Sequence, residues 1–360
     1  MPSTRVQRRS ILHSLLAGSV FGLAALAALA PSGLQAQTAT DVAALATYAG
    51  ADRTRMLIDG ARREGTLTVY ASTPNDDLAP LVEAFEAAYG VKVRVWRAGP
   101  EEVTQRAVTE ARARRHEVDI FETNAPNMEA MHREKLLQEV RSPVLADLVP
   151  QAILPHREWV GERLNLIISA YNTAAIPGPP PKSLAELTDP RWKGKLAIEA
   201  DDFDWFAAMV SSLGEEKGLA LFKDIVARNG ISVRNGHTLL TNLVASGEVP
   251  LALTVFNYKV DQLEKAGAPI KPLVLPPAIA RVNGIGLSRN APHPNAALLF
   301  YDFMLTDGQK LLEARGFVPT NAKVRKLPEG YEIRFIDAAE MLDQGKKWSR
   351  LYKDVVRQGR

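Results

Sequence analysis

The chain of 360 residues contains no cysteine, which excludes disulfides, thiolate metal sites and cysteine nucleophiles. It also lacks an excess of charge outside its first 36 residues. Those residues hold three of the 44 lysines and arginines and no acid, so the rest carries 41 basic and 41 acidic residues. A balanced body offers no electrostatic attraction for nucleic acid or anionic lipid. With 46% hydrophobic and 24% charged residues, the composition is that of a globular protein of two domains or one large one.

Long hydrophobic runs are confined to the N-terminus, where three arginines precede an apolar run over residues 15–30 that ends at Pro31. A positive region, an apolar run and a small residue at the cleavage point define a signal peptide, for which Ala36 is the predicted last residue. The run is shorter than the roughly 20 residues that cross a bilayer. Arg8 and Arg9 also fit a twin-arginine pattern, so export by the Sec or the twin-arginine route stays open. We expect the mature protein to be free in the periplasm.

Hydrophobic periodicity alternates between strands and helices along the mature chain, which favours an α/β layer fold with parallel strands joined by crossovers. Strands are expected at residues 66–70, 91–96, 119–121, 164–168, 196–198, 251–256 and 280–287, and helices at 76–89, 101–115, 128–137, 205–213, 216–228, 238–245, 260–265 and from Pro294. A stiff proline-rich segment over residues 177–181 lies between two such stretches. This order predicts two lobes that face a cleft.

The chain passes between the expected lobes more than once. The predicted divisions are a signal peptide at 1–36, lobe 1 at 37–165, lobe 2 at 166–281, a return to lobe 1 at 282–318, and a C-terminal helical segment at 319–360 whose lobe is left open.

Motifs of catalytic chemistry are absent from the sequence: it has no phosphate loop, no glycine-rich dinucleotide fingerprint, no G-x-S-x-G elbow and no HExxH. Its most concentrated group of carboxylates is Asp201, Asp202 and Asp204, just beyond an expected strand. Such a group can bind a cation, act in acid–base catalysis or cap the next helix. In α/β folds, loops at the carboxyl ends of strands are where ligand sites form.

Several motifs resemble those of periplasmic solute-binding proteins of ABC importers, and most closely the ferric-iron-binding branch. They are Pro181–Leu187 followed by Asp189-Pro190-Arg191-Trp192-Lys193-Gly194-Lys195, together with Tyr171-Asn172-Thr173, Glu122-Thr123-Asn124 and Gly316–Thr320. The resemblance implies a type II two-lobed fold with parallel-rich sheets and a ligand cleft between the lobes. It also implies a monomer that has no cofactor, catalyses no reaction and delivers a small solute to an ABC permease in the inner membrane.

The resemblance leaves the ligand open. Ferric-binding members use two adjacent tyrosines on the second lobe, often with a histidine and a glutamate from the first. Here the matching place reads Phe256-Asn257-Tyr258, and the loop over residues 70–75 holds no histidine. Because Fe³⁺ needs several anionic oxygen donors, this pattern weakens an iron site, for which only Tyr258 is a candidate.

The residues expected to bind ligand lie at the loop ends that face the predicted cleft. They are Ser72, Thr73, Gly99, Thr123, Asn124, Asp202, Asp204, Trp205, His237, Thr238 and Tyr258. Backbone amides at Thr238 favour an anion, whereas Asp202 and Asp204 favour a cation or amine, with Trp205 as an apolar wall beside them.

This mixture suits a small organic molecule or a metal complex. Four functions remain in competition: a solute receptor for an importer, a ferric-iron receptor, a secreted carboxylate-dependent hydrolase, and a periplasmic sensor or adaptor.

Overall fold

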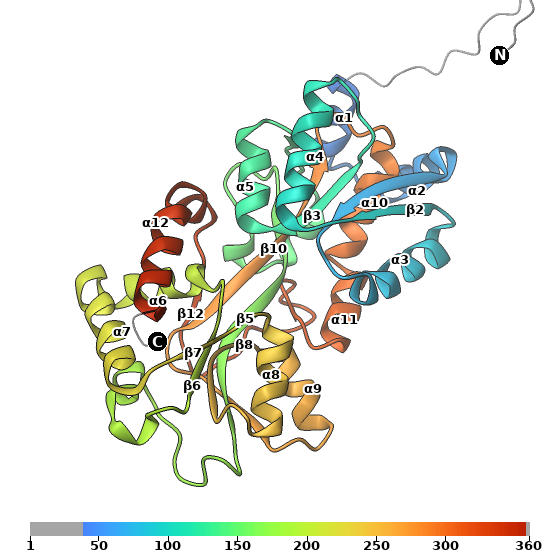
Figure 1. Ribbon diagram of the computed structural model, residues 1–360. Coiled ribbons are helices and arrows are strands. Elements are labelled where there is room, and N and C mark those ends of the chain that lie inside the picture. Colours follow the sequence, from blue (N-terminus) through green and yellow to red (C-terminus); the bar gives the residue numbers. More distant parts are fainter. Residues whose placement is uncertain (1–38, 358–360) are drawn as a thin grey trace, which may run out of the picture. The chain divides into compact units, whose positions relative to one another are not determined.

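The computed structural model describes residues 39–357, and the side chains of residues 42–356. Its central feature is a mixed sheet whose main strand order is β2-β1-β3-β10-β5-β8-β6-β7 (Figure 1). The strands are β1 (Thr66–Ala71), β2 (Lys92–Arg97), β3 (Ile120–Asn124), β4 (Leu137–Gln138), β5 (Val160–Asn172), β6 (Leu196–Glu199), β7 (Ser232–Arg234), β8 (Leu251–Phe256), β9 (Ile270–Leu273), β10 (Ala278–Ser288), β11 (Val318–Pro319) and β12 (Ile333–Phe335).

Strand direction divides the sheet. The outer pairs β1–β2, β1–β3, β6–β7 and β6–β8 are parallel, whereas β10 is antiparallel to both β3 and β5, and β5 is antiparallel to β8. The parallel arrangement expected from the sequence is therefore correct for the outer strands and wrong for the middle. Two long antiparallel strands form the middle of the sheet: β5 has 13 residues and β10 has 11.

Helices cover both faces of this sheet. They are α1 (Ala39–Thr47), α2 (Arg53–Glu64), α3 (Asn75–Tyr89), α4 (Pro100–Arg112), α5 (Ala125–Arg133), α6 (Phe203–Leu213), α7 (Glu215–Asn229), α8 (His237–Ser246), α9 (Asn257–Lys265), α10 (Pro294–Met304), α11 (Asp307–Ala314) and α12 (Ala338–Arg357). Short 3-10 turns lie at Pro143–Asp147, Pro150–Ala152, Leu184–Thr188 and Pro190–Trp192.

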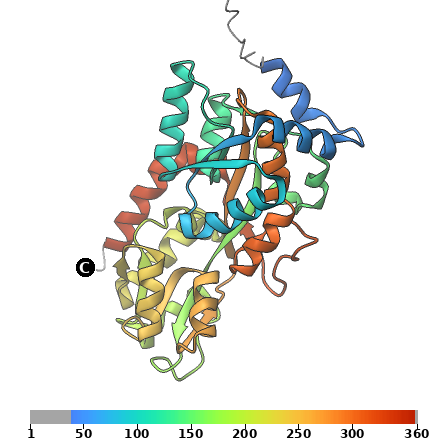
Figure 2. The same cartoon turned by 90° about the vertical axis from the view of Figure 1, so that its right-hand side faces the viewer.

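Packing pairs α2 with α10, α4 with α5 and α6 with α7. The long helix α12 contacts α5, α6 and α7, as Figure 2 shows where the red helix runs beside green and yellow ones. The C-terminal segment, whose lobe the sequence left open, therefore touches helices from both of the predicted lobes. The described residues group into one compact unit, and the predicted lobe boundaries stay a prediction.

Helix ends differ from the sequence expectation where a local backbone feature decides them. Helix α4 ends at Arg112, three residues early, because Arg114 adopts a left-handed conformation with φ of 53°. Helix α5 starts three residues early at Ala125, where the Asn124 side chain caps it by accepting a hydrogen bond from the Asn127 amide.

None of the described helices is both long and apolar enough to cross a bilayer. The predicted signal peptide at 1–36 lies outside the described residues.

Candidate ligand-binding cleft

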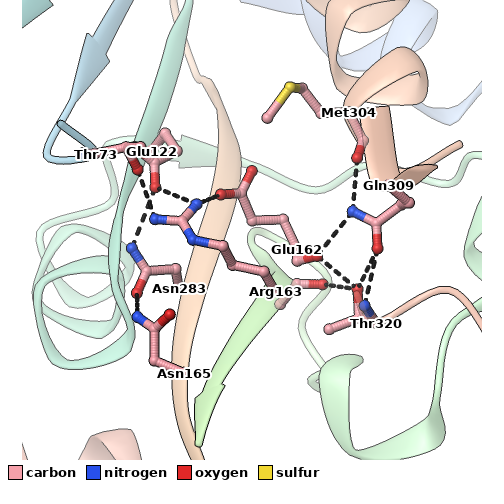
Figure 3. Close-up of polar contacts among 10 residues, drawn as sticks. Thr73, Glu122, Glu162, Arg163, Asn165, Asn283, Met304, Gln309 and Thr320 are labelled. Atoms are coloured by element: carbon pink, nitrogen blue, oxygen red, sulfur yellow. Dashed lines mark hydrogen bonds and ion pairs between the residues drawn. The ribbon is translucent and has the colours of Figure 1, made fainter. Parts of the chain in front are cut away.

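Arg163 on β5 forms the centre of a buried polar network at the middle of the sheet (Figure 3). Its guanidinium bonds Glu122 at 3.1 Å, Thr73 Oγ1 at 2.6 Å and the neighbouring Glu162. Asn283 on β10 donates to the same Glu122 at 3.2 Å. These contacts connect the loop after β1 and the middle of β3 to both long central strands.

The two carboxyl groups of this network differ in their affinity for a proton. Burial opposes the charge on Glu122, but Arg163 and hydrogen bonds from Thr73 and Asn283 outweigh it and lower the pKa of Glu122. Burial raises the pKa of Glu162 well above its ordinary value, and Arg163 offsets this only in part. Glu162 therefore carries a proton at a pH where Glu122 is ionised.

Gln309 of α11 holds the backbone of β5 from the other side. Its Nε2 donates to the carbonyls of Glu162 at 2.8 Å and Met304 at 2.7 Å, and its Oε1 accepts from the Thr320 amide at 2.8 Å (Figure 3). Each buried polar atom of the Gln309 side chain is thus satisfied, as burial requires.

Arg281 on β10 forms the centre of a second network. It donates to Asp204 at 2.8 and 2.6 Å and to Asp202 at 3.0 Å, while His237 Nε2 lies 3.0 Å from Asp202. Burial alone would favour protonated Asp202, but His237 and Arg281 overcome it and hold the pKa of Asp202 well below its usual value. Two of the three aspartates of the acidic loop, Asp202 and Asp204, are therefore paired with Arg281.

Ligating atoms of Glu199, Asp202 and His237 lie within 4.8 Å of one another, the one such group of three or more acidic or histidine side chains among residues 39–357. Both Glu199 oxygens already accept backbone bonds, from Asp201 at 2.6 Å and Gly236 at 2.8 Å. The Arg281 guanidinium is bonded to the same Asp202. A cation at this trio would have to share donors already engaged in these contacts and approach a fixed positive charge, so the geometry disfavours a metal here.

Aromatic rings connect the two networks. His237 stacks on Phe256 with ring centres 4.0 Å apart, Phe256 lies 5.8 Å from Tyr258, and Tyr258 lies 4.8 Å from Phe317. Phe317 in turn lies 5.3 Å from the Arg163 guanidinium. Burial first, and then the negative charge of Asp77, raise the pKa of Tyr258. Tyr258 is thus a neutral phenol at neutral pH.

A cavity of about 220 Å³ lies beside Arg281, where the N-terminal ends of α4, α5 and α6 meet β10 and the C-terminal segment. Its lining comprises Glu101, Asn124, Ala125, Pro126, Asn127, Asp201, Phe203, Asp204, Arg281, Val282, Ile336 and Met341. Three carboxylates and one guanidinium border it, so the cavity has an excess of negative charge. Phe203, Ile336 and Met341 give it an apolar side.

A sequence profile of bacterial extracellular solute-binding proteins matches residues 80–334. The chain belongs to this family. The matched range includes both arginines, their carboxylate partners and most of the cavity lining, so these features belong to a solute-binding transport protein.

Individual relatives agree with this assignment. The solute-binding protein is 26% identical over 260 residues to the Fe(3+)-binding periplasmic protein of Serratia marcescens, covering 68% of this chain and 75% of that protein. It is 24% identical over 267 residues to iron uptake protein A1 of Synechocystis, covering 70% and 74%.

Solved structures show the same fold. Iron-bound HitA from Pseudomonas aeruginosa matches with a TM-score of 0.69 and 22% identity, covering 81% of this chain and 99% of HitA. AfuA from Actinobacillus pleuropneumoniae, solved with fructose-6-phosphate bound, matches with a TM-score of 0.67 and 20% identity, covering 82% and 99%. One fold thus holds ligands as different as iron and a sugar phosphate, and the two-lobed class predicted from the sequence is confirmed.

The structure brings several of the predicted site residues of the solute-binding protein together. Asp202 bonds His237, and Asp204 and Asn124 line the same cavity. Thr73 belongs to the Arg163 network, and Tyr258 joins the aromatic row. Their role in binding ligand stays a prediction.

Other predicted site residues lie away from these contacts. Ser72 is half-buried with its carbonyl 3.3 Å from Arg97, Gly99 precedes α4 and donates its amide to Glu102, and Thr238 is exposed in the first turn of α8. Thr123 is fully buried on β3, and no hydrogen-bond partner satisfies its hydroxyl.

Trp205 requires a correction. Its indole is 3% exposed and lies 5.8 Å, edge to face, from Phe222 in the core beneath α6 and α7. The sequence expected it to form the apolar wall of the cleft, but that position is taken by Phe203, two residues earlier. A helix turns by about 100° per residue, so two residues decide which side chain faces the core.

The two arginines that organise the networks were not predicted from the sequence. Arg163 follows Glu162 inside a mostly apolar strand, and Arg281 interrupts a second one. Charged residues within a buried strand must be paired, so this interruption was the available signal.

Proposed function

We propose that this protein is the periplasmic binding component of an ABC importer and that its solute is a small organic molecule carrying a positive charge. The cavity beside Arg281 supports this most strongly. Glu101 and Asp201 are exposed acids on its border without ion-pair partners among the described residues, whereas Arg281 is already bonded to two aspartates. The unmatched charge at the cavity is therefore negative and would be complemented by a cationic group.

The relatives named for iron make a ferric ligand the alternative, and the chain's donors argue against it. Tyr258 has Asn257 beside it instead of a second phenol, and burial keeps the Tyr258 phenol protonated. The cavity carboxylates do not belong to the one trio of convergent acidic and histidine groups found among residues 39–357. Bare Fe³⁺ would lack the anionic oxygen donors that it requires.

We also propose that the protein catalyses no reaction. A hydrolase would need two carboxyl groups whose pKa values are pushed apart. Glu122 and Glu162 are such a pair, but both are at most 1% exposed, so a substrate cannot reach them. A sensor or adaptor role would use the same cleft and would differ only in the membrane partner that reads its occupancy.

Calorimetry with small organic cations tests this proposal through two variants of the cavity acids. Asp201→Asn and Glu101→Gln each remove one unpaired cavity charge and leave the residues of the Arg281 network unchanged. We expect each to weaken binding of an organic cation by about tenfold, since a hydrogen bond to a charged group contributes about 1.5–3 kcal/mol. Lys217→Gln, an exposed charge change on α7 away from the cavity, is the control and should leave binding unchanged.

Titration with ferric citrate tests the alternative, a ferric ligand. Saturable binding with an intense visible phenolate-to-iron band that Tyr258→Phe abolishes would overturn the organic-cation proposal. We expect no such band.

A further inference from the structure

The C-terminal segment contributes two side chains to the cavity wall. Strand β12 pairs in parallel with the start of β10, and the Ile336 amide donates to the Ala280 carbonyl at 3.0 Å. Asp337 then caps α12 by accepting the Glu340 amide at 2.9 Å. This continuous path places Ile336 and Met341, both 7% exposed, against the cavity.

Helix α12 is fixed at both ends, so this wall is held in place. Trp348 and Tyr352 are buried, with Phe206 5.5 Å from the Tyr352 ring, and the Tyr352 hydroxyl donates to the Glu199 carbonyl. At the other end Asp343 pairs with Arg133 of α5, with Nη2 and Oδ2 3.2 Å apart. The backbone of Met341 cannot move away from the cavity without breaking one of these attachments.

The acidic and the apolar side chains of the cavity come mainly from different elements. Glu101 and Asp201 come from the start of α4 and the loop before α6, whereas Ile336 and Met341 come from the C-terminal segment, with Phe203 as a third apolar side chain. A solute with a cationic group at one end and a short apolar group at the other would match both.

We infer that Met341 is a specificity-determining residue, which limits the size of the apolar group that a cationic solute carries into the cavity. This inference rests on the proposed function. Of the two cavity side chains from the C-terminal segment, Met341 changes the room in the cavity more, because its flexible thioether extends three heavy atoms beyond Cβ. A cavity of about 220 Å³ leaves little room for rearrangement around a longer solute.

A series of linear primary amines from propylamine to octylamine tests the inference by calorimetry. In the wild-type protein we expect affinity to rise about fourfold for each methylene until the chain meets Met341, and then to fall. Met341→Ala should move this optimum to a chain about two carbons longer. Leu342→Ala, one residue on and 38% exposed, is the matched control and should keep the wild-type optimum.

An unmoved optimum in Met341→Ala, with amines still bound, would overturn the inference and leave the proposed function intact. If no amine binds the wild-type protein, the proposed ligand charge is wrong, and a second experiment decides the role of Met341 without any solute.

The absence of cysteine makes that second experiment direct, because Met341→Cys and Leu342→Cys each carry a single thiol. We compare their labelling by a cationic and an anionic methanethiosulfonate reagent of similar size. In the acidic cavity Met341→Cys should react with the cationic reagent on the order of tenfold faster than with the anionic one. Leu342→Cys should show a much smaller preference. The inference would be overturned if both variants showed the same ratio of cationic to anionic labelling rates, or if the Met341→Cys thiol reacted with neither reagent. Either result would show that Met341 packs in the protein core and does not face the cavity.

Discussion

At the residue scale, the Arg163 network contains two glutamates whose pKa values shift in opposite directions. Arg163 and two hydrogen bonds lower the pKa of Glu122, while burial raises the pKa of Glu162 well above its ordinary value. The same Glu→Gln substitution should therefore have opposite consequences at the two positions.

Glu122→Gln should destabilise the protein by about 3–5 kcal/mol, because it leaves the buried Arg163 cation without its carboxylate. Glu162→Gln should be neutral or stabilising at pH 7, because a raised pKa means that folding disfavours the ionised form. The wild-type protein should approach Glu162→Gln in stability as the pH falls from 7 toward the ordinary glutamate pKa, where Glu162 is protonated in both states. Urea unfolding at several pH values measures both effects, and equal losses in the two variants would contradict this account.

Asp202 behaves in the opposite way to Glu162 as pH changes. Its pKa is lowered in the folded state, so its stabilisation is present above the ordinary aspartate pKa and is lost as the pH falls through that value toward the folded pKa. Asp202→Asn should cost about 3–5 kcal/mol at pH 7 and less in acid, because Arg281 loses a buried partner. Asp201→Asn, on the exposed neighbour, should change stability by about 0.5 kcal/mol or less. Comparable melting temperatures for the two variants at pH 7 would be evidence against the network.

At the scale of elements, the sequence predicted most strands and helices, because alternating and 3.6-residue patterns report burial directly. The strand Leu251–Phe256 matches its expected range residue for residue. The antiparallel pairing of β10 with β3 and β5 could not be predicted, since strand order depends on contacts far apart in the chain. For the same reason the sequence could single out Asp202 as a candidate site residue but could not reveal that Arg281, 79 residues later, pairs with it.

Two substitutions on helix α12 test whether core contacts or an ion pair hold this helix in place. Trp348→Ala should lower stability by about 3–5 kcal/mol, because it empties a buried site against Phe206. Asp343→Asn breaks the Arg133 pair on the same helix and should cost about 1 kcal/mol or less, because both partners are substantially exposed. Chemical denaturation measures both, and a larger loss from Asp343→Asn would show that α12 is held by its charge and not by its core contacts.

At the scale of the whole molecule, β5 and β10 run through the middle of the sheet, with parallel strands on each side of them (Figure 1). Bending of such shared strands would allow the two predicted lobes to close on a solute. Small-angle scattering should show a smaller radius of gyration with bound solute. The same radius with and without saturating solute would contradict hinge closure.

We propose that this protein carries a small organic cation to an importer. Native mass spectrometry of the protein, purified gently from the periplasm, tests it most directly because a carried solute appears as added mass. We predict a single adduct of an organic cation, lost on gentle activation and diminished in Asp201→Asn. An adduct with the mass and isotope pattern of iron, retained in Asp201→Asn and lost in Tyr258→Phe, would contradict the account.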